Sequence, residues 1–341
     1  MNEFLKSILD GIHMLIPSYG WTIVAFTILV RLCLMPLDYK SRVGMRKMSK
    51  LAPKQAELQK KYAKDQEKLQ RKLSELYRKE NVSPMSSCWP MLLSMPILFA
   101  MFGAMRMMAN EQLVQQTFDI ILTGTTQVEP FLWVKNLWMP DSPFNAAWPS
   151  LSSLQMIEAG DWLRVIETLS ADTLTALSDK IGIVLDAAAF NETRQATIEA
   201  INAALTAVPE YVSNTSGIPY LSVNLLVTTL TVVTQWNGLF LLPLLSAGSQ
   251  FLMTVLQPAA PAPTTGPDGK PQSNSNGFMK WFFPLFSLWI CAGYNAAFAV
   301  YWVTSNLIAM LQTYLINWHL DRKEKLAAEA GDTSSDNSGL K

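Results

Sequence analysis

The sequence predicts an all-α polytopic membrane protein with five transmembrane helices, a cytoplasmic helical hairpin and an extracytoplasmic lobe of helices and loops. Half of the 341 residues are hydrophobic and only 16% are charged, a low fraction for a water-soluble chain of this length. The charges are segregated along the chain. Residues 38–86 carry 14 Lys and Arg against 6 Asp and Glu, whereas residues 109–235 carry 4 against 13. A membrane between the basic and the acidic block explains this sorting most simply.

The first half of the chain divides by hydropathy. Residues 1–18 space their apolar side chains by three and four, which predicts an amphipathic helix on the membrane surface. Residues 21–37 and 88–108 are long and apolar enough to form the first two transmembrane helices. Residues 38–86 between them are polar and helix-forming, and their length fits a cytoplasmic hairpin of two helices with a turn near 62–66.

The acidic block at 109–235 is expected to form the extracytoplasmic lobe, with helical segments near 153–169 and 191–207. Residues 211–267 contain no charged side chain, so the next span within them is ambiguous. We prefer 236–256, because Trp236 precedes its apolar run and Gln257–Pro258 ends it. Residues 218–233 are rich in threonine and are either strand-like or a partial span.

The rest of the chain is clearer. Residues 257–277 are rich in Pro, Gly, Ser and Asn and predict a flexible cytoplasmic loop. The last two spans are 278–294 and 298–318, and the tail 319–341 begins basic and ends in a Gly/Ser/Asp-rich composition typical of disorder. Placing the basic hairpin in the cytoplasm puts the amino terminus outside and the tail inside. A sixth span would move the basic start of the tail outside, so parity favours five.

Enzyme chemistry finds little support in this sequence. The three cysteines, Cys33, Cys88 and Cys291, have no CxxC spacing, and the two histidines lie at opposite ends of the chain. Neither set predicts a disulfide framework, a metal site or a Ser/His relay. No predicted span holds GxSxG, HExxH or paired carboxylates. We therefore predict no catalytic residue, no metal and no cofactor.

Arg31 is the sharpest functional signal. It lies ten residues after Trp21, within an otherwise uncharged span, and a charge at the centre of a bilayer costs about 2.5–3.5 kcal/mol on insertion scales. No Asp or Glu lies in any predicted span. The simple alternative is that the side chain reaches the cytoplasmic interface or pairs with a buried carboxylate. We infer instead a hydrated cavity inside the bundle.

Other polar side chains of the spans are candidates to line that cavity. Ser246 and Gln250 are four residues apart and share a helix face. Each of these side chains alone is equally well explained by an interhelical hydrogen bond. The full set comprises Thr27, Ser246, Gln250, Thr304, Ser305, Asn306 and Gln312. The methionines between residues 85 and 108 are a further feature, suited either to an adaptable surface for apolar partners or to ordinary packing.

Several motifs, in order along the chain, resemble the YidC family of membrane protein insertases. Residues 27–37, with Arg31 and the following Pro36-Leu37, look like the first core span of that family, and the basic hairpin is similar to its first cytoplasmic loop. The matching motifs of the later spans are Pro90 with Met95-Pro96, Pro243 with Gln250, and the segment Val300-Tyr301-Trp302-Val303-Thr304-Ser305-Asn306-Leu307. Two departures are Asn295-Ala296-Ala297, where Pro and Gly are usual, and the long lobe 109–235.

The resemblance implies a bacterial plasma membrane protein that inserts newly made proteins into the lipid bilayer, alone or with the Sec translocon, without nucleotide hydrolysis. It implies a hydrophilic groove lined by Arg31, Gln250 and Trp302, with Tyr301 near the path of the client, and it makes the ribosome an expected partner and DNA none. We add Thr27, Ser246, Ser305 and Asn306 to the predicted groove. The alternative function is a secondary transporter or channel that binds a small anion at Arg31; such proteins usually show internal repeats, and this sequence has none that we detect.

Overall fold

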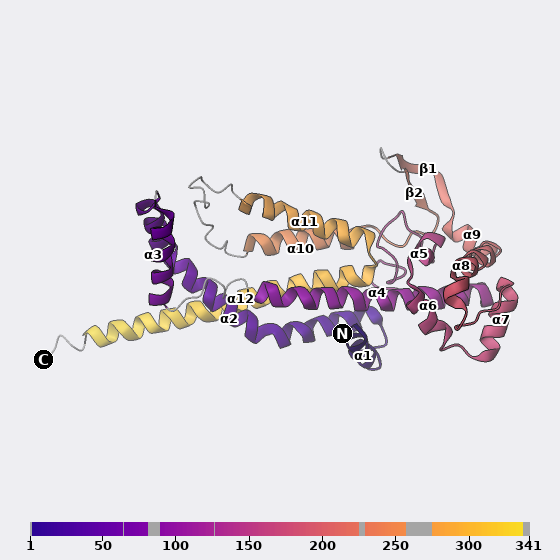
Figure 1. Ribbon diagram of the computed structural model, residues 1–341, viewed down its shortest axis with the longest axis horizontal. Coiled ribbons are helices and arrows are strands. Elements are labelled where there is room, and N and C mark those ends of the chain that lie inside the picture. Colours follow the sequence, from indigo (N-terminus) through magenta and orange to yellow (C-terminus); the bar gives the residue numbers. More distant parts are fainter. Residues whose placement is uncertain are drawn as a thin grey trace. The chain divides into compact units, whose positions relative to one another are not determined.

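The structure is a computed structural model that describes residues 2–63, 65–80, 89–125, 127–224, 229–256 and 275–336. It is mostly helical (Figure 1). Its contacts define two compact units. The first comprises Met1–Phe26, Leu98–Gly248 and Leu285–Val303, and the second comprises Thr27–Ile97, Ser249–Pro284 and Thr304–Lys341.

Five helices carry the apolar runs and contribute residues to both units. They are α2 (Tyr19–Lys61), α4 (Trp89–Thr123), α10 (Leu241–Leu256), α11 (Ser275–Gly293) and α12 (Ala296–Asp336). Within the described ranges, α2 and the segment Ala296–Leu326 of α12 are long and apolar enough to cross a membrane, and α10 is a shorter apolar helix. The flexible loop predicted at 257–277 falls largely outside the described residues, apart from the first turn of α11.

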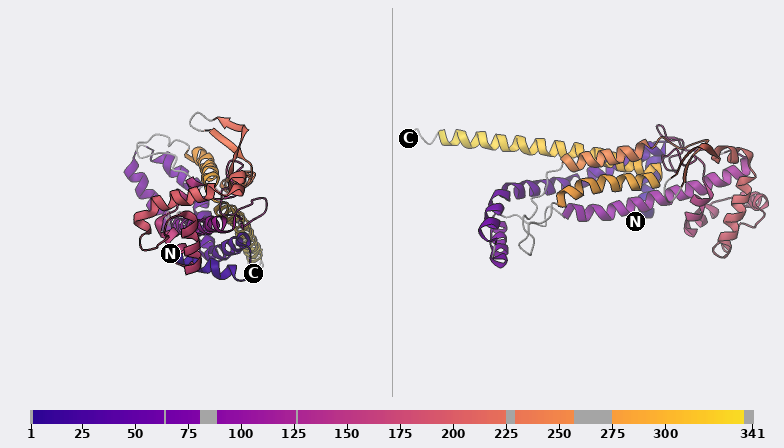
Figure 2. Two further views of the ribbon diagram at one scale, coloured as in Figure 1. Left: turned by 90° about the vertical axis from the view of Figure 1, so that its right-hand side faces the viewer. Right: turned by 90° about the horizontal axis from the view of Figure 1, so that it is seen from above.

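Three helices continue well beyond the predicted spans. α2 runs from the first span into the hairpin without a break, although Pro36 and Pro53 lie inside it. α4 continues to Thr123, because its extra turns bury apolar side chains such as Phe118, and it ends where Gly124 takes a left-handed conformation (φ 78°). α12 continues to Asp336 where we expected disorder (Figure 2). Hydropathy locates where the apolar run ends, and a helix that remains favourable in water continues past that point.

In the second unit, the predicted turn of the basic hairpin is confirmed. α2 ends at Lys61 and α3 spans Gln66–Lys79, with the Asp65 side chain accepting a hydrogen bond from the Lys68 backbone N–H at 3.0 Å. Lys54 of α2 forms an ion pair of 2.9 Å with Glu80, which follows the last residue of α3, and Leu51 and Leu69 of the two helices are buried.

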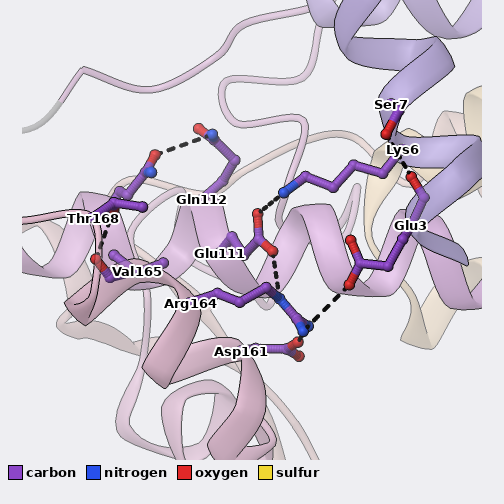
Figure 3. Close-up of polar contacts among 10 residues, drawn as sticks. Glu3, Lys6, Ser7, Glu111, Gln112, Asp161, Arg164, Val165 and Thr168 are labelled. Carbon is purple, nitrogen blue, oxygen red and sulfur yellow. Dashed lines mark hydrogen bonds and ion pairs between the residues drawn. The ribbon is translucent and has the colours of Figure 1, made fainter. Parts of the chain in front are cut away.

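In the first unit, an ionic cluster joins the amino-terminal helix α1 (Asn2–His13) to α4 and to α6 (Ala159–Ile166). The nearly buried Glu111 carboxylate of α4 accepts from Lys6 Nζ at 2.6 Å and from Arg164 Nε at 2.8 Å (Figure 3). Arg164 also pairs with Asp161 and, at 3.5 Å, with Glu3. The polar face of α1 is therefore held by the protein. The predicted surface location of α1 stays a prediction.

The lobe has a hydrophobic core of its own. Helices α6, α7 (Ala171–Ile181) and α8 (Phe190–Thr206) gather about the carboxyl-terminal end of α4, where Trp162 packs near Phe118 (Figure 1). The single helix expected near 153–169 is instead two, α5 (Leu151–Met156) and α6, because Ile157 and Glu158 are extended between them. A short α9 (Pro209–Thr215) follows α8.

The described residues of the segment 218–233 form strands rather than a helix. β1 (Gly217–Asn224) pairs antiparallel with β2 (Thr229–Val233), with an irregular register between Gly217 and Ser222. Threonine and β-branched side chains favour a strand over a helix in such a short run. The lobe expected to hold only helices and loops therefore also contains a small sheet.

Two loop segments hold the starts of three helices. The clamp, as we name it, comprises residues 129–147 and 235–240. Its Glu129 carboxylate accepts from the Tyr19 backbone N–H at 2.9 Å, at the start of α2. Its Met139 carbonyl accepts from the Ala296 N–H at 3.0 Å, at the start of α12. Helix starts carry unpaired N–H groups and partial positive charge, so these acceptors stabilise them.

The start of α10 is held by the fully buried Asp141 carboxylate. It accepts from the backbone N–H groups of Phe240 at 3.0 Å and Leu242 at 2.7 Å, and from Trp133 Nε1 at 3.0 Å. A Cβ atom added at Gly238 would lie 2.0 Å from Asp141 Oδ1, so only glycine fits there. Phe240 adopts a positive φ of 63°, which a non-glycine residue keeps only where its surroundings fix it. Residues 236–240, predicted as the first part of the span 236–256, thus belong to the clamp, and α10 begins at Leu241.

The remainder of the lobe is an insertion between the two parts of the clamp. The Ala147 N–H donates to the Gln235 carbonyl at 3.1 Å, so the chain leaves the clamp and returns to it at neighbouring points. Buried Asn237 joins the two parts by donating to the carbonyls of Asn136 and Met139 at 2.9 and 3.0 Å. The region predicted as one lobe at 109–235 therefore contains the end of α4, the first part of the clamp and the insertion 148–234.

Candidate functional site

The candidate site lies in the second unit, where α2 and α12 pair through polar side chains. From Arg31 onward, residues of α2 contact residues of α12 that lie 271 to 281 positions later in the sequence. A nearly constant offset means that the two helices run in the same direction. Nineteen residues separate Arg31 from Lys50, so the paired stretch is about 28 Å long.

Arg31 is half-buried and donates to one hydroxyl of α12. Its Nε and Nη2 atoms lie 3.0 and 2.6 Å from Ser305 Oγ, and Ser305 itself is only 7% exposed. The Gln312 amide Nε2 donates to the Arg31 backbone carbonyl at 2.9 Å, close to Pro36, whose ring removes a helical donor from this turn of α2. Among the described residues, Arg31 forms no ion pair with a carboxylate. The positively charged guanidinium of Arg31 is thus hydrogen-bonded to a neutral hydroxyl group.

The next polar residues on this face of α2 are Asp38 and Arg42, both beyond the span predicted at 21–37. Arg42 is half-buried and donates through Nη2 to the buried Thr313 hydroxyl of α12. Burial raises the pKa of the Asp38 carboxyl, and the positive charges of Arg31 and Arg42 oppose that shift. One carboxylate therefore lies within electrostatic range of two arginines, a counter-charge that the search of the spans for Asp and Glu did not find.

Further along the pair, the cations of α2 meet carboxylates. Arg46 pairs with Asp321 and lies 3.5 Å from Glu324, which also accepts from Lys50 Nζ at 3.0 Å. Lys50, Asp321 and Glu324 are exposed to solvent, whereas Arg46 is half-buried. An ion pair between exposed groups contributes about 0–1 kcal/mol. Along the line of contacts between α2 and α12, which we call the seam, arginines first hydrogen-bond to hydroxyl groups, and further along Arg46 and Lys50 form ion pairs with carboxylates.

The other predicted groove residues are distributed over both units. In the second unit Thr27 is buried, Gln250 is half-buried, and Asn306 Nδ2 donates to Ser249 Oγ at 3.1 Å. No described contact joins Gln250 to Arg31. The structure brings two of the predicted residues to Arg31. Ser305 contacts the Arg31 side chain, and the Gln312 side chain contacts the Arg31 backbone carbonyl.

Three predicted residues lie in the first unit. Ser246 donates to the carbonyls of Pro243 at 2.7 Å and Ser287 at 3.3 Å, so it serves the contact between α10 and α11. Tyr301 is buried, and Trp302 lies near Phe298, with 5.5 Å between ring centroids. The indole Nε1 of Trp302 is buried and has no hydrogen-bond partner within the described part of the chain. The described methionines of α4 in this unit, Met101, Met105, Met107 and Met108, are core residues rather than an adaptable surface.

Sequence reasoning missed Asp38, Arg42 and Thr313. Arg42 follows Arg31 by eleven residues, which is three helical turns and therefore the same face of α2. The signal was present, but we considered only side chains inside the span predicted at 21–37.

Long apolar helices that bury polar side chains against one another, with an arginine inside one of them, define an integral membrane protein of the helical-bundle class. The chain belongs to the 60Kd inner membrane protein family, whose sequence model matches residues 11–207 and 189–323.

Curated relatives carry the name membrane protein insertase YidC. The protein of Clostridium perfringens is 40% identical over 146 residues, which are 41% of this chain and 54% of that protein. The protein of Wolinella succinogenes is 39% identical over 137 residues, 40% of this chain and 23% of the relative. That of Campylobacter jejuni is 43% identical over 102 residues, 30% of this chain and 19% of the relative. The match thus spans about half of the Clostridium protein and less of the others.

Proposed function

We propose that this chain inserts newly made proteins into the bacterial plasma membrane, and that Arg31 receives a polar or acidic segment of the client in a hydrophilic groove. The observation that carries the proposal is the guanidinium inside an apolar helix, bound to the Ser305 hydroxyl rather than to a carboxylate. Such a cation retains its charge for a ligand. A client segment that pairs with it crosses a shorter apolar distance, and burial of the client's own apolar span in lipid then drives its release.

Two features of the fold support five membrane crossings, by α2, α4, α10, α11 and α12. The constant offset between α2 and α12 requires parallel helices, and the first and fifth of five consecutive crossings are parallel. Strands β1 and β2 form a two-stranded sheet with two open edges. Open edges exposed to lipid do not occur in the hydrocarbon region, so residues 218–233 do not supply a sixth span.

In the proposed topology the basic block 38–86 faces the cytoplasm, as the bias of Lys and Arg favours, so the tail is also cytoplasmic and the lobe is outside. The proposed partners are nascent membrane proteins and the lipid bilayer. Clients would come directly from the ribosome or by way of the Sec translocon. The excess of Lys and Arg in 38–86 suits the phosphates of ribosomal RNA or of anionic headgroups.

The function is tested by depletion and reconstitution. Depleting the protein is expected to leave small one- or two-span membrane proteins outside the bilayer, and purified protein in vesicles is expected to insert the same clients without nucleotide. Protease protection of a radiolabelled client measures both. Vesicles that take up a small anion but insert no client would instead identify a transporter.

The topology is tested by cysteine labelling in a variant whose Cys33, Cys88 and Cys291 are replaced by serine. Ala176 of α7 and Ser74 of α3 are both exposed positions in helices. A membrane-impermeant maleimide added to intact spheroplasts is expected to label Ala176→Cys and not Ser74→Cys, and lysis is expected to make both react. Labelling of Ser74→Cys before lysis would reverse the proposed orientation.

A further inference from the structure

Two arginines of α2 are held in the same way, and a third is not. Arg31 donates to the Ser305 hydroxyl and Arg42 to the Thr313 hydroxyl, both of them buried acceptors on α12. Arg46, four residues beyond Arg42 on the same face, pairs with Asp321 and Glu324 instead. The hydroxyl contacts fix the positions of the first two guanidinium groups without neutralising them, whereas carboxylates neutralise the third.

The charges near Arg42 sum to an excess of positive charge. Asp38 is the carboxylate that acts on both Arg31 and Arg42, and a single negative charge cannot balance two cations. The contact with Thr313 uses one nitrogen of Arg42, and a guanidinium has five N–H donors, so donors remain for a carboxylate ligand. Half-burial strengthens the interaction of that charge with an anion compared with a fully solvated lysine.

We propose that Arg42 is a second receptor for acidic client segments, which it engages before they reach Arg31. Eleven residues of helix place the two about 16 Å apart along α2. A client carboxylate therefore moves from one cation to the other along the seam between α2 and α12. This inference rests on the proposed insertase function and adds a residue that selects clients by charge.

The experiment compares Arg42→Gln with Arg46→Gln in reconstituted vesicles. Two clients are used, matched except for acidic or neutral residues in the translocated segment. Arg42→Gln is expected to slow the acidic client about fivefold and the neutral client less than twofold, and to weaken the dependence of the acidic rate on salt. Arg46→Gln removes a charge that is already paired and is expected to change the ratio of the two rates less than twofold.

Two further variants separate charge from packing. Arg42→Lys keeps the charge and is expected to retain most of the acidic rate. Thr313→Val removes the hydroxyl and keeps Arg42, so it too is expected to retain that rate. If Arg42 merely joins the helices, Thr313→Val and Arg42→Gln should lower the melting temperature and both client rates together, and that result overturns the inference.

Two further outcomes would contradict the role of Arg42 or the proposed insertase function. Equal effects of Arg42→Gln and Arg46→Gln on the acidic client contradict a special role for Arg42. Wild-type protein that inserts neither client contradicts the proposed function itself, whereas wild-type insertion that Arg42→Gln leaves unchanged contradicts this inference alone.

Discussion

Replacing Arg31 with alanine is expected to reduce insertion of clients with acidic translocated segments by at least about tenfold, and to affect uncharged clients least. The estimate follows from the loss of a charged partner, since one hydrogen bond to a charged group contributes about 1.5–3 kcal/mol. Arg31→Lys keeps the positive charge and loses the forked donor geometry, so it should retain much of the activity. Insertion rates of matched acidic and neutral clients, measured beside melting temperature in detergent, give the result.

Ser305→Ala provides the matched control for Arg31. It removes the hydroxyl that the guanidinium contacts at 2.6 and 3.0 Å and leaves the charge in place. A receptor role predicts a mild effect of Ser305→Ala on the acidic client. If Arg31 instead serves only to join α2 to α12, both substitutions should destabilise the protein and impair every client equally. Equal loss for both clients, in step with the melting temperature, would end the receptor interpretation.

Gly238→Ala, at the one glycine of the clamp, is expected to cause a large loss of stability. The added Cβ would lie 2.0 Å from Asp141 Oδ1 and must displace the carboxylate that binds the N–H groups of Phe240 and Leu242. A buried donor left without a partner costs about 1–3 kcal/mol, so two of them predict a loss of about 2–6 kcal/mol. Thermal unfolding in detergent measures it.

Gly248→Ala is the control for that substitution. Gly248 lies inside α10, and a Cβ added there meets no atom within 4 Å. Alanine is favoured over glycine in a helix by about 0.8–1.0 kcal/mol, so this variant should be as stable as the wild type or more stable. Equal melting temperatures for Gly238→Ala and Gly248→Ala would show that the clamp does not hold α10.

The sequence predicted where the apolar helices lie and failed on where they end. The first span was predicted to end at Leu37, but α2 continues to Lys61 with Pro36 and Pro53 inside it. The clamp could not be predicted because Asp141 and Phe240 are 99 residues apart and meet only through tertiary contacts. The strands at 217–233 were one of two alternatives, and their threonine content was the correct signal.

For the candidate site, the sequence identified Arg31 because a charged side chain in a membrane span has a high free energy. That argument does not require knowing which residue Arg31 contacts. Its partner could not be selected, because Ser305 was one of seven polar candidates and the residue favoured for this place, Gln250, makes no described contact with it. Asp38 and Arg42 were missed because the hairpin was treated as separate from the span. One continuous helix places both on the face that carries Arg31.

The length of α12 has a mechanical consequence. Its 41 residues extend about 60 Å, twice the roughly 30 Å of a bilayer's hydrocarbon core. In the topology proposed above, about half of α12 therefore extends beyond the hydrocarbon core. The ion pairs of Asp321 with Arg46 and of Glu324 with Lys50 hold this part of α12 beside α2. A partner bound at the far end of α12 is thereby held at a fixed distance from the lipid. Because the helix is long, a small tilt of α12 displaces its far end by a larger distance.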